Sequence, residues 1–436
     1  MPKPNVITAI DLGTDKCVTL IATSGSPEQK LRIVGVAAVP SRGMKRSSIV
    51  DLEQVMQTIT ESVDAAERMA GFEVQSAYVS VSGAHINSRN SKGVVAVAAP
   101  DQEITRLDVE RVIEAARAIS LPTDQQVMHV IPRDFKVDSQ EGVKDPVGMT
   151  GVRLESEAHI ITGLSTSLKN LEKCLHDLGL DVDDFVFSGL AAAQVVLTET
   201  EKELGVAVVD IGAGTTSVCV YVDGCLEYSG AVPVGARHVT QDIALGCRIS
   251  IDQAEKIKMA LASAEIEVPQ PMPGESKEDF NRRRKKADQL DLTSVGIYDF
   301  PEKLSKRTLV EGIMMPRMKE IFQMISDQLN KHDLLSQIPA GLVLSGGGAE
   351  TVRISEVARR VMNLPVRVGA PTQLEGLVGD INKPLFATSV GLVVYGWEHG
   401  GSTASVSKGG VRSLVSHFNW RGVTDKISKI LKSILP

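Results

Sequence analysis

The chain has 436 residues, of which 43% are hydrophobic and 23% are charged. This length predicts two or more domains, and the composition is that of an ordinary soluble protein. A net charge of −7 and an aromatic content of 4% argue against nucleic acid as a main partner, because surfaces that bind nucleic acid are basic and often offer aromatic rings to the bases.

Cysteine usage and hydropathy predict a cytosolic chain. The five cysteines form no C-x-x-C pair and no cluster with zinc spacing, which favours reduced thiols. No apolar run approaches the roughly 20 residues that span a bilayer. The first residues lead directly into a predicted strand, so we expect no signal peptide.

The first 82 residues predict a β-β-β-α-β unit. Residues 7–22 (ITAIDLGTDKCVTLIA) have the pattern of a strand, a tight turn and a second strand. A third strand is expected at 31–39. A helix at 51–70 follows, because apolar residues recur there at helical spacing and Gly71 is a typical helix stop. The last strand of the unit is expected at 77–82.

Residues 83–164 differ in character from the first unit. They contain the proline- and glycine-rich stretch 141–151 (EGVKDPVGMTG). One helix is expected at 106–118, and strands are expected at 93–99, 126–131 and 158–162. Three histidines, His85, His129 and His159, have no fixed spacing, so we interpret them as packed or surface side chains rather than as metal ligands.

Residues 165–204 predict two helices separated by a strand. The first helix is expected at 167–178 and the strand at 184–187. The second helix, at 189–197, contains three consecutive alanines. Small residues let two helices approach closely, as a hinge crossing requires, although a well-packed alanine-rich helix is the simpler interpretation.

Residues 205–224 (GVAVVDIGAGTTSVCVYVDG) repeat the strand–turn–strand pattern of 7–22. Asp210 matches Asp11, and a turn of small residues follows each of them. Such turns can point several backbone N–H groups at one anion, because glycine allows close approach and positive φ. A carboxylate beside a phosphate requires a cation between them, so the pair of hairpins indicates a Mg-nucleotide between duplicated lobes. Two ordinary β-hairpins are the alternative.

The second half of the chain adds two features. Glu255 and Lys258 share a face of a helix predicted at 251–261. A third glycine-rich turn, at 345–348, follows the strand expected at 341–344. Between these features, residues 265–305 contain four prolines and a basic run, which predicts an exposed, irregular segment. A long helix at 309–330 and a helix at 384–396 complete the predicted elements.

Three motifs carry a resemblance: Asp-Leu-Gly-Thr at 11–14, Asp-Ile-Gly-x-Gly-Thr-Thr at 210–216 and Leu-Ser-Gly-Gly-Gly at 344–348. They resemble the nucleotide-binding motifs of the actin-like ATPase superfamily. Within it, the whole chain resembles the FtsA family, bacterial division proteins that link the tubulin-like FtsZ polymer to the membrane. The resemblance implies an α/β, actin-like ATPase fold with two lobes, each a mixed sheet flanked by helices, and an FtsA-type 1C insertion.

The resemblance also implies a division into subdomains. The segment 41–44 resembles a recurring FtsA segment, although a plain polar turn is the alternative. The implied ranges are 1–82 and 165–197 for 1A, 83–164 for 1C, 198–240 and 305–398 for 2A, 241–304 for 2B, 399–421 for a flexible linker and 422–436 for an amphipathic membrane-targeting helix.

ATP and Mg²⁺ are the ligands that the resemblance implies. Asp11 and Asp210 would hold Mg²⁺ through water, and the late glycines would pack on the adenine. Glu255 and Lys258 match the Glu-x-x-Lys pair of actin-like chaperones, although a solvated ion pair is the alternative. The implied nucleotide-binding residues are Asp11, Gly13, Thr14, Asp15, Lys16, Asp210, Gly212, Ala213, Gly214, Thr215, Thr216, Glu255, Lys258, Gly346, Gly347 and Gly348.

One departure from the superfamily concerns hydrolysis. Actin-like chaperones carry Glu-Pro at the start of the helix that matches 189–197, and the glutamate helps to position the attacking water. This chain has Ser188, Gly189 and Leu190 there. Without a carboxylate to orient water, we predict slow or absent ATP hydrolysis.

The C-terminal residues predict a membrane anchor. Residues 399–421 are rich in Gly and Ser, as flexible linkers are. In 422–436 lysines fall opposite an apolar stripe, which suits a helix lying in an anionic membrane surface better than one docked on the protein's own core. The apolar stripe consists of Val423, Ile427, Ile430, Leu431, Ile434 and Leu435.

The family resemblance implies an ATP-binding cell division protein on the cytoplasmic face of the cell membrane, at the septum. It would tether the FtsZ ring through the FtsZ C-terminal tail on 2B, self-associate into filaments and recruit downstream division proteins through 1C. The alternatives are a PilM-type pilus assembly scaffold and, from another class, a sugar or acetate kinase on the same fold. The missing glutamate and the amphipathic tail disfavour the kinase.

Overall fold

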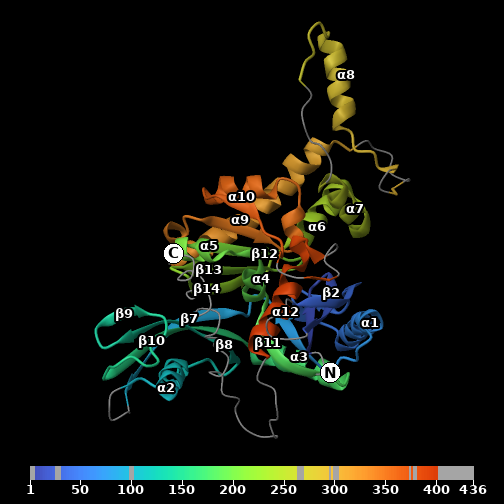
Figure 1. Cartoon of the computed structure of the whole chain (residues 1–436). Helices are drawn as coiled ribbons and strands as arrows, with labels where there is room; N and C mark the ends of the chain where they lie inside the picture. The colour runs from blue at the N-terminus through green and yellow to red at the C-terminus, as the bar shows by residue number, and fades with distance from the viewer. Residues whose placement is uncertain are drawn as a thin grey trace, which may run out of the picture.

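Two mixed β-sheets form the centres of two lobes (Figure 1). The computed structural model describes residues 5–24, 31–97, 103–262, 270–293, 296–297, 304–372, 375–376 and 381–400. The first sheet has the strand order β11-β6-β1-β2-β3-β17. Its strands are β1 (Asn5–Leu12), β2 (Lys16–Ser24), β3 (Arg32–Pro40), β6 (Ser76–Val81), β11 (Asp181–Phe187) and β17 (Glu375–Gly376).

The second sheet repeats the arrangement at the centre of the first. Its order is β14-β13-β12-β15-β16. In the first sheet β1 pairs with β2 antiparallel and with β6 parallel; in the second, β12 pairs with β13 antiparallel and with β15 parallel. The fold is therefore the predicted duplicated, actin-like one. The strands are β12 (Val206–Ile211), β13 (Thr216–Val222), β14 (Cys225–Val232), β15 (Gly341–Ser345) and β16 (Val366–Val368).

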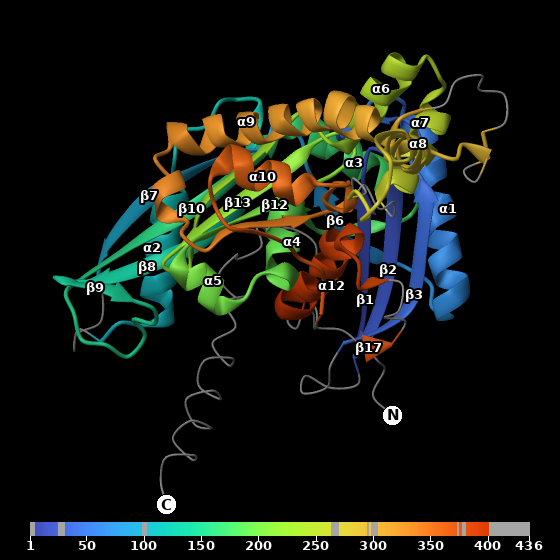
Figure 2. The ribbon, with the colours of Figure 1, turned by 90° about the horizontal axis from the view of Figure 1, so that it is seen from above.

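Helices cover both faces of the first sheet. Figures 1 and 2 show α1 and α12 on opposite sides of β1 and β2. Asp51 caps α1 by accepting from the backbone N–H of Gln54. Gly71 ends the helix in the left-handed conformation, as the sequence predicted. The helices of this lobe are α1 (Leu52–Ala70), α3 (Ser165–Asp177), α4 (Ser188–Val196) and α12 (Ala387–His399).

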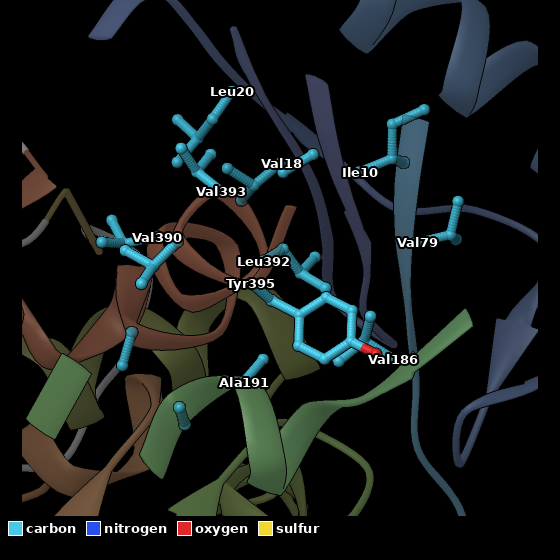
Figure 3. Close-up of a cluster of buried hydrophobic side chains, with 14 of the residues drawn as sticks. Ile10, Val18, Leu20, Val79, Val186, Ala191, Val390, Leu392, Val393 and Tyr395 are labelled. Atoms are coloured by element: carbon cyan, nitrogen blue, oxygen red, sulfur yellow. The ribbon is translucent and has the colours of Figure 1, made fainter. Parts of the chain in front are cut away.

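Small residues set the crossing of α4 and α12. A Cβ added to Gly391 would overlap the carbonyl oxygen of Ala191, so the two helices lie in direct backbone contact. Figure 3 shows Val393 of α12 beside Leu20 of the first sheet, and Tyr395 of the same helix near Val186. Although α12 falls in the range expected for the second lobe, it contacts β1, β2 and β6, and β17 pairs with β3.

The second lobe carries most of the remaining helices. Pro316 has no N–H to continue an α-helical ladder, and the predicted helix at 309–330 is instead a π-helix, η2 (Thr308–Met314), followed by α9. The segment predicted to be irregular contains α8, which extends away from the lobe (Figure 1). The helices are α5 (Glu199–Leu204), α6 (Ala236–Cys247), α7 (Ile251–Ala262), α8 (Lys277–Asp288), α9 (Met315–Lys331) and α10 (Ile354–Met362).

A separate four-stranded sheet, in the order β7-β10-β8-β9, is inserted after β6. Helix α2 packs against it over a small core of its own. The inserted elements are β7 (Asn87–Ala96), α2 (Arg106–Arg117), β8 (Gln125–Val137), β9 (Gln140–Val143) and β10 (Arg153–Leu164). The short elements elsewhere are β4 (Met44–Lys45), β5 (Ser48–Ile49), η3 (Leu335–Gln337), η4 (Gly347–Glu350) and η5 (Pro384–Phe386).

Two histidines of the inserted sheet, His129 and His159, are packed side chains. His129 and His159 are buried, and burial lowers the pKa of each to about 3. His159 contacts Asn90 and Ser229, and His129 accepts from the backbone of Phe187. Within the described ranges no three His, Cys, Asp or Glu side chains are grouped to hold a metal. The predicted linker beyond residue 400 and the amphipathic helix at 422–436 lie outside these ranges.

Candidate functional site

A cavity of about 390 Å³ lies between the two lobes. Every residue that the sequence predicted to bind the nucleotide, except Thr216, lines it. Thr216 is buried and donates to the carbonyl of Val234 at 2.8 Å. It misses the cavity because side chains alternate between the faces of a strand, so its neighbours Thr215 and Ser217 face the cavity instead.

The two hairpin turns have the same geometry. The N–H of Gly13 donates to the carbonyl of Lys16, and the N–H of Gly212 donates to that of Thr215, both at 2.9 Å. The turns also touch each other: a Cβ on Gly214 would lie 2.5 Å from the Thr14 hydroxyl. Glycine is therefore required for the two turns to approach the same small volume, as predicted for a phosphate site.

Asp11 and Asp210 end the first strand of each hairpin and face the cavity. Ser80 donates to Asp11 at 2.6 Å, and Thr388 donates to Asp210 at 3.0 Å. Burial raises the pKa of Asp11, against the lowering effects of Ser80 and Lys16. Burial and the charge of Asp11 raise the pKa of Asp210 to about 7. The two carboxylates thus repel each other in a poorly hydrated space.

Lys16 lies close enough to Asp11, Asp15, Asp210 and Glu350 for their charges to raise its pKa, but burial has the larger effect and lowers it. One ammonium only partly compensates the surrounding carboxylates. A divalent cation would fit this excess of negative charge. Because Mg²⁺ loses its water ligands reluctantly, such a cation would keep several of them beside Asp11 and Asp210, as it does in nucleotide sites.

Glu255 and Lys258 form an ion pair of 2.8 Å at the α7 side of the cavity. The buried Thr240 of α6 orders the pair, donating to Glu255 at 2.6 Å and accepting from Lys258 at 3.0 Å. The Lys258 side chain is only 12% exposed. The pair is therefore anchored at the cavity rather than freely solvated.

The third glycine turn follows β15 and also lines the cavity. Gly346 has a φ of +78°, and a Cβ there would collide with the Asp210 carboxylate; one on Gly348 would collide with Ile211. Contacts within the protein therefore exclude a side chain at either position, whether or not a ligand lies flat on the turn. The 3₁₀ helix η4 occupies the turn, and α10 starts at Ile354.

Several lining residues were not predicted. One is Arg237, which lies 3.4 Å from Asp15 across the two lobes. Ser80 and Ser82 could have been found from topology, since β6 runs parallel to β1 and brings them to the same sheet edge as Asp11. No local sequence signal points to the others. The unpredicted polar lining residues are Ser47, Ser80, Ser82, Ser188, Ser217, Arg237, Glu350, Thr351 and Thr388.

Comparison with protein families decides what this architecture is. Residues 83–162 match the model described as the SHS2 domain inserted in FTSA, and residues 207–391 match that of the cell division protein FtsA. The FtsA of Pseudomonas aeruginosa is 38% identical, covering 93% of this chain and 92% of that protein. The chain belongs to the FtsA family.

Further relatives agree with the assignment. The FtsA of Borreliella burgdorferi is 37% identical over 90% of this chain and 91% of its own length. The FtsA of Escherichia coli K12 is 34% identical over 92% of this chain and 93% of its own length. An FtsA-type role in cell division follows from this similarity over nearly the whole length, and the inserted four-stranded sheet corresponds to the SHS2 domain of the family.

Among solved structures, the PilM–PilN type IV pilus biogenesis complex matches with a TM-score of 0.61 at 15% identity, over 90% of this chain and 98% of that one. At this identity the match shows the shared fold alone, so the PilM-type alternative gains no support from it. In the part of the chain that the structure describes, no helix is long and apolar enough to cross a membrane.

Proposed function

We propose that the chain binds ATP with Mg²⁺ in the cavity between its lobes. The observation that carries this proposal is the contact between the two hairpin turns around one cavity, with Asp11 and Asp210 at matching positions. Backbone N–H groups of both turns and Lys16 would hold the phosphates. Asp11 and Asp210 would hold Mg²⁺ through water, and the bound cation would neutralise the phosphate oxygens beside them.

The nucleoside would occupy the α7 side of the cavity. There the ordered pair of Glu255 and Lys258 offers an acceptor and a donor to the ribose and the adenine edge. Gly346–Gly348 would let the adenine lie flat against the turn, because a side chain there would occupy the space of the ring. The site would therefore select a nucleoside triphosphate over an inorganic one.

Slow hydrolysis is part of the proposal. Ser188 lines the cavity where actin-like chaperones carry a glutamate, and its hydroxyl lies 2.8 Å from that of Ser217. A serine hydroxyl does not accept a proton from water at neutral pH, so it cannot act as the general base. Bound ATP would then serve mainly to set the conformation and the assembly state.

We propose further that the chain acts at the division septum, on the cytoplasmic face of the membrane. The amphipathic pattern of residues 422–436 supports anchoring to an anionic lipid surface. The anchored chain would assemble into filaments and tether the FtsZ ring. Its membership of the FtsA family supports this role, and the inserted SHS2 domain would contact later division proteins.

The FtsZ tail would bind the 2B region, which includes α8. This helix has no buried residue. Arg283 is held by Glu275 at 2.7 Å, so it is poorly suited to an external partner. The exposed groups later in the helix, Arg284, Lys285 and Lys286, are the better candidates for an acidic tail.

Calorimetric titration of the full chain tests the nucleotide site. ATP in excess Mg²⁺ is expected to bind with one site per chain, and replacing Mg²⁺ by EDTA is expected to weaken binding at least tenfold. The variant Asp11→Asn should lose most of this Mg²⁺ dependence. Binding that is equally strong in EDTA, or absent in Mg²⁺, would contradict the proposed site.

A further inference from the structure

The β4–β5 turn reaches into the phosphate end of the cavity. Strands β4 and β5 pair antiparallel, and the turn residues between them are Arg46 and Ser47. Their φ angles are +48° and +58°, a left-handed conformation that only glycine adopts without cost. Positive φ at both central residues is the type I′ geometry that two-residue β-hairpins favour, so this short hairpin itself fixes where the Ser47 backbone N–H and side chain lie.

Ser47 contacts both phosphate hairpins at once. Its backbone N–H donates to the hydroxyl of Thr14 at 3.0 Å, and its own hydroxyl lies 2.9 Å from that of Thr215. The turn also fits closely against the second hairpin, because a Cβ on Gly214 would lie 3.0 Å from the Cα of Arg46. One residue from a third segment therefore fixes the spacing of the two hairpins.

The Ser47–Thr215 contact begins a chain of hydroxyls across the lobe boundary. Thr215 lies 3.2 Å from Ser82, Ser82 lies 2.9 Å from Ser217, and Ser217 lies 2.8 Å from Ser188. All five side chains line the cavity. Three come from the first lobe and two from β13 or the turn before it, so the chain joins the lobes where the two hairpins meet.

We propose that Ser47 is a positioning residue that makes the site discriminate a nucleoside triphosphate from a diphosphate. The inference rests on the proposed function of the cavity. A terminal phosphate between the hairpins needs donors from both turns together, so it is sensitive to their spacing. A diphosphate lacks that group and loses less when the spacing is relaxed.

The variant Ser47→Gly separates this role from a structural one. Glycine removes the hydroxyl contact with Thr215 but keeps the backbone N–H to Thr14, and it adopts positive φ freely. The melting temperature of the nucleotide-free chain is therefore expected to stay the same or rise. A merely structural serine would leave the ratio of ATP to ADP affinity unchanged.

The experiment is a titration of the full chain with Mg-ATP and with Mg-ADP. For Ser47→Gly we expect the preference for ATP over ADP to fall about fivefold, the effect of losing about one hydrogen bond. Ser48→Ala is the matched control, because Ser48 is exposed and does not line the main cavity; it should keep the wild-type preference. Thr215→Val should lower the preference, and adding Ser47→Gly to it should add little.

Three results would overturn the inference. If wild type and Ser47→Gly bind ATP with the same preference over ADP, the positioning role is wrong while the proposed nucleotide site stands. If the wild-type chain binds neither nucleotide, the proposed function fails and this inference fails with it. Fully additive effects of Ser47→Gly and Thr215→Val would also contradict the shared contact.

Discussion

Asp11 and Asp210 occupy equivalent positions in the two lobes and face one cavity from opposite sides. Each carboxylate receives a hydroxyl donor, from Ser80 and from Thr388. Burial nevertheless raises the pKa of both, and the charge of Asp11 raises that of Asp210 further, to about 7. The site is thus electrostatically unfavourable with both carboxylates charged, and the proposed divalent cation would relieve this repulsion.

The raised pKa of Asp210 predicts a pH dependence of stability. Its folded pKa lies above the unfolded value, so its contribution is fully present below the unfolded pKa and is lost as pH rises through about 7. Between pH 6 and pH 8 the melting temperature of the nucleotide-free chain should therefore fall more for wild type than for Asp210→Asn. For a chain of 436 residues each kcal/mol of difference corresponds to about 1 °C, because the unfolding entropy is about 2.1 cal/mol/K per residue.

Differential scanning fluorimetry at constant ionic strength measures this effect. The comparison with Asp210→Asn isolates Asp210 from the buried histidines, whose lowered pKa values act in the opposite direction. Added Mg²⁺ should raise the wild-type melting temperature more at pH 8 than at pH 6. Identical pH profiles of melting temperature for wild type and Asp210→Asn would show that the titration of Asp210 does not affect stability in this range.

Gly214→Ala is expected to abolish tight ATP binding. The added Cβ would lie 2.5 Å from the Thr14 hydroxyl and 3.0 Å from the Arg46 backbone, so the two hairpins must separate. Gly312→Ala is a matched control, since its nearest new contact is an ordinary 3.8 Å. Calorimetry should show at least a tenfold loss for Gly214→Ala and none for Gly312→Ala. Equal affinities would show that hairpin contact is not needed for binding.

Lys258→Ala should weaken binding of ATP by about tenfold, the effect of losing a charged hydrogen bond. Binding of inorganic tripolyphosphate should not change, because Lys258 lies at the proposed nucleoside side of the cavity. Competition titrations with both ligands measure the difference. Equal losses of affinity for ATP and tripolyphosphate would show that Lys258 contacts the phosphates instead. No loss for either ligand would show that the Glu255–Lys258 pair has only a structural role.

ATP hydrolysis by the purified chain should be slow. Ser188 and Ser217 supply hydroxyls rather than a general base beside the phosphates. We expect turnover on the order of 10⁻³ s⁻¹ or slower, as in nucleoside triphosphatases that lack a residue to stabilise the transition state. A phosphate-release assay measures it, and fast turnover that requires Mg²⁺ would contradict the account of Ser188.

The motifs of the site could be predicted from the sequence because each is local. A carboxylate at the end of a β-run followed by small residues marks both hairpins, and three glycines after a strand mark the third turn. Thr216 belongs to the second hairpin motif, but it is the first residue of β13, where alternation turns its side chain away from the cavity. Its partner is a backbone carbonyl 18 residues later.

The rest of the site depends on tertiary contacts that no local pattern reveals. Ser47 and Thr388 reach the cavity from segments outside both hairpins: Ser47 contacts Thr14, 33 residues away, and Thr388 contacts Asp210, 178 residues away. The same holds for the lobes: α12 follows the second-lobe segments in the chain but packs on the first sheet, since its glycine at 391 fits against Ala191 of α4. The spacing of apolar residues at 309–330 predicted one helix but could not distinguish the π-helix before Pro316 from an α-helix.

The proposed tethering of FtsZ to the membrane can be measured by co-pelleting FtsZ of the same organism with anionic liposomes, in the presence of ATP and Mg²⁺. FtsZ should pellet with the full-length chain and remain in solution with a chain ending at Arg421. FtsZ that stays in solution although the full-length chain pellets would contradict the tether, and equal pelleting of both chains would contradict the C-terminal anchor.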